Sequence, residues 1–497
     1  MKISFNLLFF FFFINADAQV LVLPGDHPDP SVVKIGDTYW SSSTTSNWFP
    51  AFPLMQSKDL LHWKQQAYVF TQMPSWADYY FWAPEISYDH GKVYIYYAAH
   101  KKNGNLCVAV ASADKPEGPF KDHGPLVCQE DGSIDAFPMR DENGKLFLIW
   151  KEDANSIGKP TPIWIQEMNE DRTALLGEKR ELFRNNVAWE SNLVEGVSMT
   201  RHGDYFYAFY AGAGCCGAGC SYAEGIARSK SLMGPWEKYS GNPVLKNLGR
   251  WTCPGHGTPI EKDGHYYFLF HAYDRSSNIF TGRQGLLMEY RFTTDNWIEF
   301  LPSENNADAQ PQNVSEKFKG HDLSNQWQWT VFQHPSYSLH KGMLWLEASQ
   351  NGAGSFIGQK IESGNYIATI NLCAKRTSSA AGLAAIGDEN NLLSVLFDKG
   401  RITIVERREG KSNNLLDKQV GKTVMPYKKF FLRMEVRNSH EIYFLYSLDG
   451  KNFTALNDAF INGTYLPPWD RAVRVGLISS GNENQQAVFN NFDLTYQ

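Results

Sequence analysis

Three carboxylates and a histidine open similar segments in the first 300 residues of the chain. They are Asp29, Asp135, Glu195 and His256, and the equivalent place in the remaining segment holds Ala83. Like charges that meet raise each other's pKa, and burial raises it further. Such a cluster is costly to assemble, so a protein that keeps one usually uses it for acid–base chemistry. Each acid taken singly could cap a turn. However, four of the five equivalent positions carry an acid or a histidine, which favours a shared site.

The segments that position these residues form a repeat. Each has a polar residue, a short apolar strand, a glycine turn and an aromatic strand. The turn glycines recur at intervals of 53 to 61 residues and are Gly36, Gly91, Gly144, Gly203 and Gly264. Helical periodicity is nearly absent, so the repeats consist of strands.

Roughly four strands per repeat are typical of a β-propeller blade. Five repeats therefore predict an all-β fold with a five-bladed β-propeller over residues 19–303. Two stacked β-sandwiches are the alternative, but the regular spacing disfavours them. The innermost strand of each blade lines the central channel, so the opening residues should converge at one end of it.

The pattern changes after the fifth repeat. The polar stretch "PSENNADAQPQNVSE" indicates a linker at residues 304–313. Residues 314–497 contain short strands with closely spaced turn signals. These features predict a second all-β domain with the architecture of a β-sandwich.

The first 18 residues have the pattern of a secretory signal peptide. Lys2 precedes a short apolar run, and "NADA" supplies a small-residue cleavage site, so we expect cleavage between Ala18 and Gln19. The apolar run is too short to span a bilayer. We therefore expect an exported monomer, periplasmic or extracellular, without membrane insertion. A net charge of −6 is too mild to indicate a nucleic-acid partner.

The chain has seven cysteines, and an odd number leaves at least one thiol unpaired in an exported protein. Cys215, Cys216 and Cys220 gather in the stretch "GAGCCGAGC". The spacing of zinc ligands is not clear there. We interpret the stretch as a glycine-rich loop with a disulfide to Cys253.

Five motifs, taken together, resemble the motif set of glycoside hydrolase family 43. They are "HPDPSV", "FWAPEI", "SIDAFPMRDENGK", "VEGVSM" and "GHGTPI", in order over residues 24–300. The C-terminal part resembles the lectin-like, concanavalin-like β-sandwich (a jelly roll) that follows many of these enzymes. The resemblance implies a five-bladed propeller, no required cofactor, and hydrolysis with inversion at arabinofuranosyl or xylosyl linkages.

The resemblance also implies roles for individual residues. Asp29 matches the general base, Glu195 the general acid, and Asp135 the carboxylate that orients the acid and raises its pKa. An inverting glycosidase needs an ionised carboxylate to activate water and a protonated one to assist the leaving group. Arg283, in "TGRQ", matches an arginine that contacts the sugar, and the alternative is a surface arginine on a strand.

The resemblance implies two roles for His256. It either contacts the catalytic acids and the substrate, or helps to hold a calcium or similar ion in the channel. Hard cations prefer oxygen ligands, so a lone histidine is a weak metal signal. His271, in "FHAY", is a second candidate, and we interpret it as a hydrogen-bonded core histidine.

Aromatic residues near the motifs are candidates for substrate contact. Trp82 could stack on a sugar face or pack between blades. We expect Phe137 to pack near the site, and Trp48 and Trp251 lie on loops that could form walls of the pocket. Glu85, inside a strand, is interpreted as structural and not as a further catalytic acid.

The predicted function is an inverting hydrolase that releases terminal α-L-arabinofuranosyl residues from plant polysaccharides or oligosaccharides. A β-xylosidase, or an endo-acting arabinanase or xylanase, would use the same acids on another saccharide. A carbohydrate-binding propeller without turnover is the alternative from a different class. The C-terminal domain could bind carbohydrate, send a loop to the rim of the site, or only stabilise the propeller.

Overall fold

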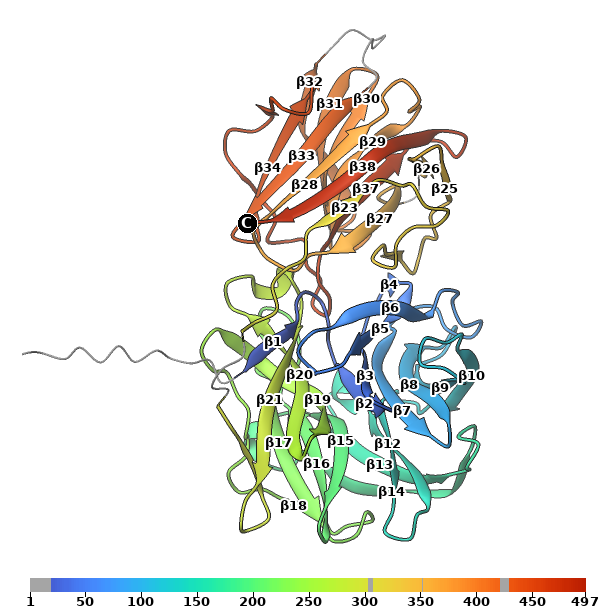
Figure 1. The fold of residues 1–497 in the computed structure, drawn as a ribbon, viewed down its shortest axis with the longest axis vertical. Coiled ribbons are helices and arrows are strands. Elements are labelled where there is room, and N and C mark those ends of the chain that lie inside the picture. Colours follow the sequence, from blue (N-terminus) through green and yellow to red (C-terminus); the bar gives the residue numbers. More distant parts are fainter. Residues whose placement is uncertain (1–18, 303–306, 351, 421–428) are drawn as a thin grey trace, which may run out of the picture.

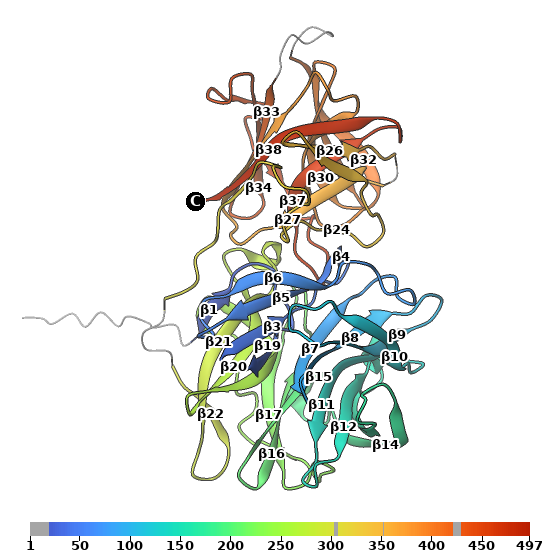
Figure 2. The same ribbon diagram turned by 45° about the vertical axis from the view of Figure 1, so that its right-hand side comes forward.

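The computed structural model of the protein describes residues 19–302, 307–350, 352–420 and 429–497. The predicted signal peptide and the first residues of the predicted linker lie outside these ranges. The described chain forms a propeller followed by a sandwich, and the sandwich lies next to the first blade (Figures 1 and 2). No helix among the described residues is long and apolar enough to cross a membrane.

The propeller has five antiparallel sheets, one for each predicted repeat. Blade 1 contains β2 (Ser31–Ile35), β3 (Thr38–Ser42), β5 (Ala51–Ser57) and β6 (Lys64–Phe70). Blade 2 contains β7 (Trp82–Asp89), β8 (Lys92–His100), β9 (Leu106–Ala113) and β10 (Lys121–Val127). Blade 3 contains β11 (Ser133–Arg140), β12 (Leu146–Glu152), β13 (Pro162–Met168) and β14 (Leu175–Arg184). Blade 4 contains β15 (Val194–His202), β16 (Tyr205–Gly212), β17 (Ala223–Ser229) and β18 (Glu237–Lys238).

Blade 5 joins the two ends of the propeller. It contains β19 (Trp251–Lys262), β20 (His265–Asp274), β21 (Gln284–Phe292), β22 (Ile298–Phe300) and the N-terminal strand β1 (Val20–Leu23). The register of β1 on β21 places Val20 opposite Leu287. Short 3-10 helices connect strands at η1 (Ala154–Ile157), η2 (Ala188–Glu190) and η3 (Asn278–Phe280). The first strand of the chain therefore closes the ring.

The glycine turns explain why the repeats fold as hairpins. All five predicted turn glycines join the first two strands of a blade and have positive φ: Gly36, Gly91, Gly144, Gly203 and Gly264. Glycine populates this left-handed region without the steric cost that other residues meet. The predicted repeat and the propeller fold are therefore confirmed.

The inner strands carry irregularities where the predicted site residues lie. Asp29, Ala83, Asp135 and His256 have φ values of 51°, 44°, 57° and 44°, and in blade 4 the left-handed residue is Gly196 at 61°. The register of the inner strand shifts at this level in blades 2 to 5. Bulges of this kind bend a strand and change the direction of its side chains. The backbone thus turns the opening residues toward a common point.

Aromatic side chains pack the blades against each other. Phe209 of blade 4 stacks on Phe268 of blade 5, with ring centroids 4.7 Å apart. Both side chains are fully buried. Truncating a buried phenylalanine to alanine typically destabilises a protein by about 3–5 kcal/mol. Packing of aromatic side chains between neighbouring blades therefore holds the blades in place around the channel.

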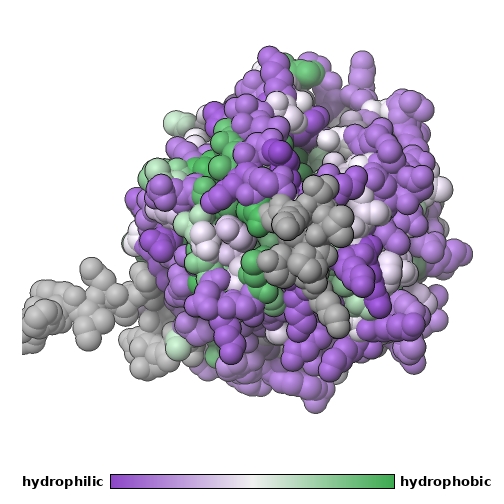
Figure 3. All heavy atoms as spheres, turned by 90° about the horizontal axis from the view of Figure 1, so that it is seen from above, coloured by the Kyte–Doolittle hydropathy of each residue, from purple (hydrophilic) through white to green (hydrophobic). Residues whose placement is uncertain are grey.

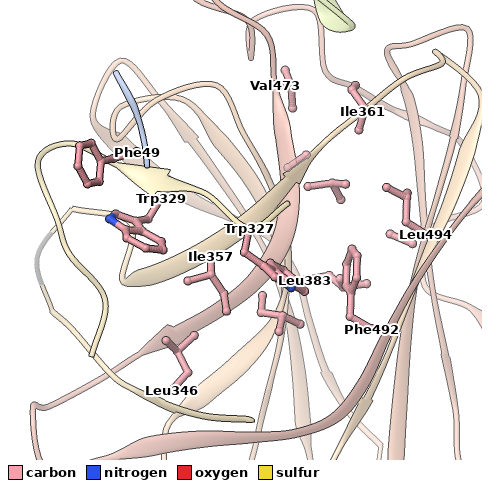
Figure 4. Packing of buried hydrophobic residues seen from close by; sticks show 14 of the residues in the cluster. Phe49, Trp327, Trp329, Leu346, Ile357, Ile361, Leu383, Val473, Phe492 and Leu494 are labelled. Atoms are coloured by element: carbon pink, nitrogen blue, oxygen red, sulfur yellow. The ribbon is translucent and has the colours of Figure 1, made fainter. Parts of the chain in front are cut away.

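The C-terminal sandwich consists of two antiparallel sheets. One contains β23 (Val314–Glu316), β25 (Tyr337–His340), β26 (Met343–Glu347), β28 (Tyr366–Leu372), β33 (Phe430–Arg437), β34 (Glu441–Ser447), β35 (Thr454–Ala455), β36 (Ile461–Asn462) and β38 (Gln486–Tyr496). The other contains β27 (Ser355–Lys360), β29 (Ala380–Ile386), β30 (Leu392–Asp398), β31 (Arg401–Arg408), β32 (Lys411–Gln419) and β37 (Arg474–Ser480). Side chains such as Leu383 and Phe492 fill the core between them (Figure 4). The face seen in Figure 3, which looks down on the sandwich, is largely hydrophilic.

The two domains share structure. Strand β4 (Trp48–Phe49) of the propeller pairs with β24 (Trp329–Thr330) of the C-terminal domain. Phe49 and Trp329 lie 6.3 Å apart between ring centroids and belong to the core shown in Figure 4. Buried Arg474 of the sandwich also pairs with buried Asp26 of the propeller at 3.0 Å. The sandwich is therefore joined to the propeller by a strand pair, apolar packing and an ion pair.

All seven cysteines lie in the described residues. The predicted bond between the glycine-rich loop and Cys253 is confirmed, and its partner is Cys220. Cys107 pairs with Cys128, and Cys215 pairs with its neighbour Cys216. Cys373 remains as the free thiol that the odd count predicts.

Candidate active site

A pocket of about 530 Å³ lies where the inner strands of the blades converge. Ligand pockets usually have volumes of this order. Its lining includes the predicted site residues Asp29, Trp82, Asp135, Glu195, His256 and Arg283. Trp469 and Asp470 of the sandwich complete the wall. The structure thus brings side chains from all five blades and from the second domain to one pocket.

Asp29 is buried in a cationic and polar environment. Its Oδ1 lies 2.9 Å from Nη1 of Arg283, and the hydroxyl of Thr44 donates a hydrogen bond of 2.7 Å to its Oδ2. Nδ1 of His256 and Nδ1 of His271 lie 3.4 and 3.3 Å from Oδ1. Burial raises the pKa of Asp29, but the charge of Arg283, the nearby His256 and the hydrogen bond from Thr44 lower it more, to about 2. Asp29 is therefore a carboxylate at neutral pH.

The backbone at Asp29 has a strained conformation that neighbouring hydrogen bonds hold in place. Its φ of 51° lies in the left-handed region, which costs a non-glycine residue about 1–3 kcal/mol. The backbone N–H of Asp29 donates to Nδ1 of His271 at 3.0 Å. The backbone N–H of Thr44 donates to the carbonyl of Pro28 at 2.9 Å. These bonds and the flanking prolines fix the direction of the carboxylate. His271, which is fully buried, thus positions Asp29.

Glu195 lies between two donors. The hydroxyl of Tyr222 donates to its Oε1 at 2.9 Å, and Nζ of Lys151 contacts its Oε2 at 2.5 Å. Lys151 is 1% exposed and also pairs with Asp153 at 2.9 Å. The sequence analysis missed Lys151 and Tyr222. A signal for Lys151 existed, because the predicted hairpin of blade 3 pairs it with Ile134, next to Asp135.

The pKa of Asp135 is raised above its ordinary value. Burial raises its pKa most, His256 opposes this effect, and the charge of Glu195 adds to it, with a result of about 6. The Oδ2 of Asp135 accepts a hydrogen bond of 2.9 Å from the backbone N–H of Gly196, which holds the Asp135 carboxyl beside Glu195. The like-charge repulsion predicted from the sequence is present, and it acts on the pKa of Asp135.

His256 packs at the centre of the pocket. A Cβ at Gly196 would lie 2.7 Å from its Cγ, so only glycine fits beside the ring. The backbone N–H of His256 donates to Oε2 of Glu224, a buried carboxyl whose pKa burial raises strongly. The sequence analysis did not identify Glu224. These contacts fix the imidazole near Asp29.

The predicted ion at His256 has little support from the donor set. Within the described part of the chain, no three His, Cys, Asp or Glu side chains gather so that they could hold a metal ion. The nearby oxygen of Asp29 is already paired with Arg283. A hard cation prefers six or more oxygen ligands, so these residues do not fit one. The ion remains a prediction, and no step below depends on it.

A loop of the sandwich forms one wall of the pocket. The ring of Trp469 lies 6.1 Å from that of Trp82 in an edge-on arrangement. The carbonyl of Asp470 accepts a hydrogen bond of 3.3 Å from Nη2 of Arg283, and its carboxylate accepts one from the hydroxyl of Ser46. Of the roles considered for the C-terminal domain, the structure shows a loop at the rim of the site.

Other candidates lie elsewhere. Phe137 is buried in the hydrophobic cluster of blades 3 and 4 and does not line the pocket. The prediction that Trp48 and Trp251 form walls of the pocket is wrong. Trp48 is buried at the domain junction, where its Nε1 donates to the carbonyl of Ala472, and Trp251 is buried in the core of blade 5. Glu85 accepts a hydrogen bond from Thr258, which agrees with a structural role.

Comparison with known proteins gives two family matches and several relatives. Residues 19–298 match the model described as glycosyl hydrolases family 43, and residues 315–495 match the beta xylosidase C-terminal concanavalin A-like domain. A xylan 1,3-β-xylosidase of a Vibrio species is 27% identical over 276 residues, which are 51% of this chain and 49% of that protein. A non-reducing end α-L-arabinofuranosidase of Bacteroides ovatus is 24% identical over 420 residues, 76% of this chain and 75% of that protein.

The chain spans about half the length of the Vibrio relative. Among solved structures, a xylan β-1,4-xylosidase from Bacillus halodurans has a TM-score of 0.81 at 20% identity and covers 95% of this chain and 99% of its own. At this identity the likeness shows the fold, which is that of a propeller with a C-terminal sandwich. Because the family model covers more than half of the residues, the chain belongs to the glycosyl hydrolases of family 43.

Proposed function

We propose that the protein hydrolyses terminal α-L-arabinofuranosyl linkages in plant polysaccharides or oligosaccharides, with inversion of configuration. One observation carries the proposal. In a single pocket, the environment lowers the pKa of Asp29 to about 2, whereas burial and the charge of Glu195 raise the pKa of Asp135 to about 6. Carboxyls whose environments separate their pKa values are the pattern expected for a general base and a general acid.

Asp29 is the proposed general base. It is ionised over the physiological range, and Thr44 and Arg283 hold both of its oxygens. From this position it accepts a proton from the water that attacks the anomeric carbon. Removing a proton from the attacking nucleophile contributes about 10²–10⁴-fold to a rate. Arg283, held between Asp29 and the sandwich, also lines the pocket and is the proposed sugar contact.

Glu195 is the proposed general acid, and Asp135 is its partner. Asp135 retains a proton at a pH where Asp29 has lost its own. Tyr222 and Lys151 orient the carboxyl of Glu195 toward the pocket, where it donates the proton to the departing glycosidic oxygen. An inverting enzyme needs the acid and base on opposite faces of the sugar. Their position in blades 4 and 1, across the channel, supports this arrangement.

The wall that the sandwich adds to the pocket supports release of a terminal residue. The sandwich adds Trp469 and Asp470 to a pocket that the propeller alone would leave more open. The name of the Bacteroides ovatus relative, a non-reducing end α-L-arabinofuranosidase, supports the same saccharide. The name of the Vibrio relative, a xylosidase, favours the second candidate, a β-xylosidase that uses the same carboxyls.

Export and the monomeric state are further parts of the proposal. Three disulfides form in the described chain. Disulfides persist in oxidising compartments and are rare in the cytosol. This supports the export expected from the first 18 residues.

The decisive experiment compares aryl α-L-arabinofuranoside and aryl β-D-xyloside as substrates side by side. We expect turnover of the arabinofuranoside to dominate, and dominance of the xyloside would replace the first candidate by the second. Proton NMR of the first product should show the inverted anomer, and retention would refute the mechanism. Sugar binding without turnover of either substrate would indicate a binding propeller.

A further inference from the structure

The pocket wall contains a feature that the proposed mechanism does not use. Cys215 and Cys216, adjacent in sequence, are bonded to each other and both line the pocket. They lie in the loop between β16 and β17 and are half-buried. The lining of the same pocket also includes Glu195 and Trp469.

This bond cannot serve as an ordinary staple. A disulfide stabilises a fold by closing a loop in the unfolded chain, and the effect grows with loop length. The other two bonds close separations of 21 and 33 residues, whereas Cys215 and Cys216 are separated by one. The bond between neighbours therefore fixes only the local shape of the loop, at the place where the loop meets the pocket.

The surrounding contacts hold this local shape in place. The loop begins after β16, where Ala211 is paired with Glu195 across the hairpin. The backbone N–H of Ser221 donates to the carbonyl of Gly214 at 2.9 Å, which brings the two ends of the loop together. The bond between Cys220 and Cys253 ties the loop to blade 5. The pair is thus anchored on both sides and cannot withdraw from the pocket freely.

The wall of the sandwich meets the loop at the next residue. The backbone N–H of Gly217 donates a hydrogen bond of 3.3 Å to the hydroxyl oxygen of Tyr273. A Cβ at Gly217 would lie 3.4 Å from the backbone oxygen of Trp469. The loop residue next to the disulfide therefore lies close to Trp469, and the lining of the same pocket contains the disulfide, Trp469 and Glu195.

The chemistry of this surface differs from that of the catalytic groups. A disulfide has no hydrogen-bond donor, and its sulfurs are polarizable and weakly accepting. A sugar ring has hydroxyl groups at its edge and C–H groups on its faces, so it needs apolar surface as well as charges. A closed ring of two residues has few rotamers to lose on binding, and pre-organisation of this kind favours affinity.

We propose that the Cys215–Cys216 disulfide is a sugar-contacting wall, which packs against a C–H face of the ring bound in the pocket. It fixes the ring beside Glu195 and helps to select the pentose. This inference rests on the proposed function for the identity of the ligand, but not for the presence of a sugar contact. The disulfide takes no part in proton transfer.

The test is the double substitution Cys215→Ala with Cys216→Ala. We expect KM for the preferred aryl glycoside to rise about tenfold while kcat changes less than about threefold, because a contact of this kind acts on binding. The dissociation constant of free L-arabinose or D-xylose, measured by calorimetry, should rise equally. The matched control is Cys107→Ala with Cys128→Ala, which removes a bond outside the pocket lining and should leave KM and sugar affinity unchanged.

The two proposals fail in different ways. If the wild type binds a pentose without hydrolysing either substrate, the function fails, and weaker binding by the double variant still supports the contact. Equal sugar affinity in the wild type and the double variant overturns the contact. If the wild type binds neither pentose, the contact is also overturned.

A second measurement does not depend on folding of the variant. The wild type is treated with a mild reductant and iodoacetamide, and labelling is followed by mass spectrometry. L-Arabinose or D-xylose should slow labelling of Cys215 and Cys216 and leave labelling of Cys107 and Cys128 unchanged. Labelling of the adjacent pair at the same rate with and without both sugars contradicts the contact.

Discussion

Replacing Lys151 by methionine removes the one buried cation that contacts the proposed acid. Nζ of Lys151 lies 2.5 Å from Glu195 and 2.9 Å from Asp153. Its positive charge favours the ionised carboxylate and also lowers the pKa of Asp135. Methionine keeps most of the side-chain volume and removes the charge. Asp135 should then retain its proton to higher pH.

The size of the effect follows from the geometry. An opposite charge within about 4–6 Å shifts the pKa of a carboxyl by about 1–3 units. The alkaline limb of kcat/KM reports the acid of the free enzyme. In Lys151→Met this limb should move upward by about 1–3 pH units relative to the wild type. The acid limb, set by the proposed base Asp29 with a pKa of about 2, lies below the assayed range.

The assay is the pH dependence of kcat/KM for the preferred aryl glycoside between pH 3 and 10. The control is Lys145→Met in the same hairpin, which removes an exposed cation paired with Glu167 at 3.1 Å and should leave the alkaline limb in place. Loss of one partner of a buried ion pair can destabilise a protein by about 3–5 kcal/mol. Thermal unfolding therefore accompanies each profile. An unchanged or lowered alkaline limb in a folded Lys151→Met protein would refute the reasoning.

Three further predictions concern the pocket. In Asp29→Ala, kcat should fall by at least about 100-fold, while calorimetry shows sugar affinity within a few-fold of the wild type, and retained turnover would exclude Asp29 as the base. Asp135 has a pKa raised from 3.8 to about 6, so its contribution to stability is present below pH 3.8 and is lost as the pH rises to 6. Asp135→Asn should therefore be more stable than the wild type above pH 6, by about 3 kcal/mol, and not near pH 3, as measured by urea unfolding. In Trp469→Ala, KM should rise about 3–10-fold for lack of an aromatic contact, with a smaller change in kcat. An unchanged KM would show that the sandwich wall does not touch the sugar.

The propeller could be predicted from sequence because its determinants are local and recur. The turn of each hairpin needs a residue with positive φ, which a glycine such as Gly144 supplies. The strands on either side are short, so their pattern can be recognised within a few residues. The regular spacing of the repeats also predicts which residue begins each inner strand. The convergence of Asp29, Asp135, Glu195 and His256 is a consequence of ring symmetry and needed no knowledge of distant contacts.

The remaining site residues could not be predicted because distant segments supply them. Trp469 lines the pocket because the sandwich is joined to the propeller, in part by the pairing of β4 with β24. No local sequence pattern predicts that pairing. Tyr222 depends on the path of the glycine-rich loop. The errors at Trp48 and Trp251 have the same origin, because a tryptophan beside a motif can face the pocket or the core, and the choice is made by the packing of neighbouring elements.

Closure of the ring by β1 has a consequence for synthesis of the protein. Asp29 follows the first strand, but its partners His271 and Arg283 belong to the last blade. A nascent chain with four finished blades already contains Asp135 and Glu195, yet it lacks His271 and Arg283, which fix the proposed base Asp29. We therefore expect activity to appear only in the final step of folding, when the last blade pairs with the first strand. Activity can then be used to measure completed assembly of the ring.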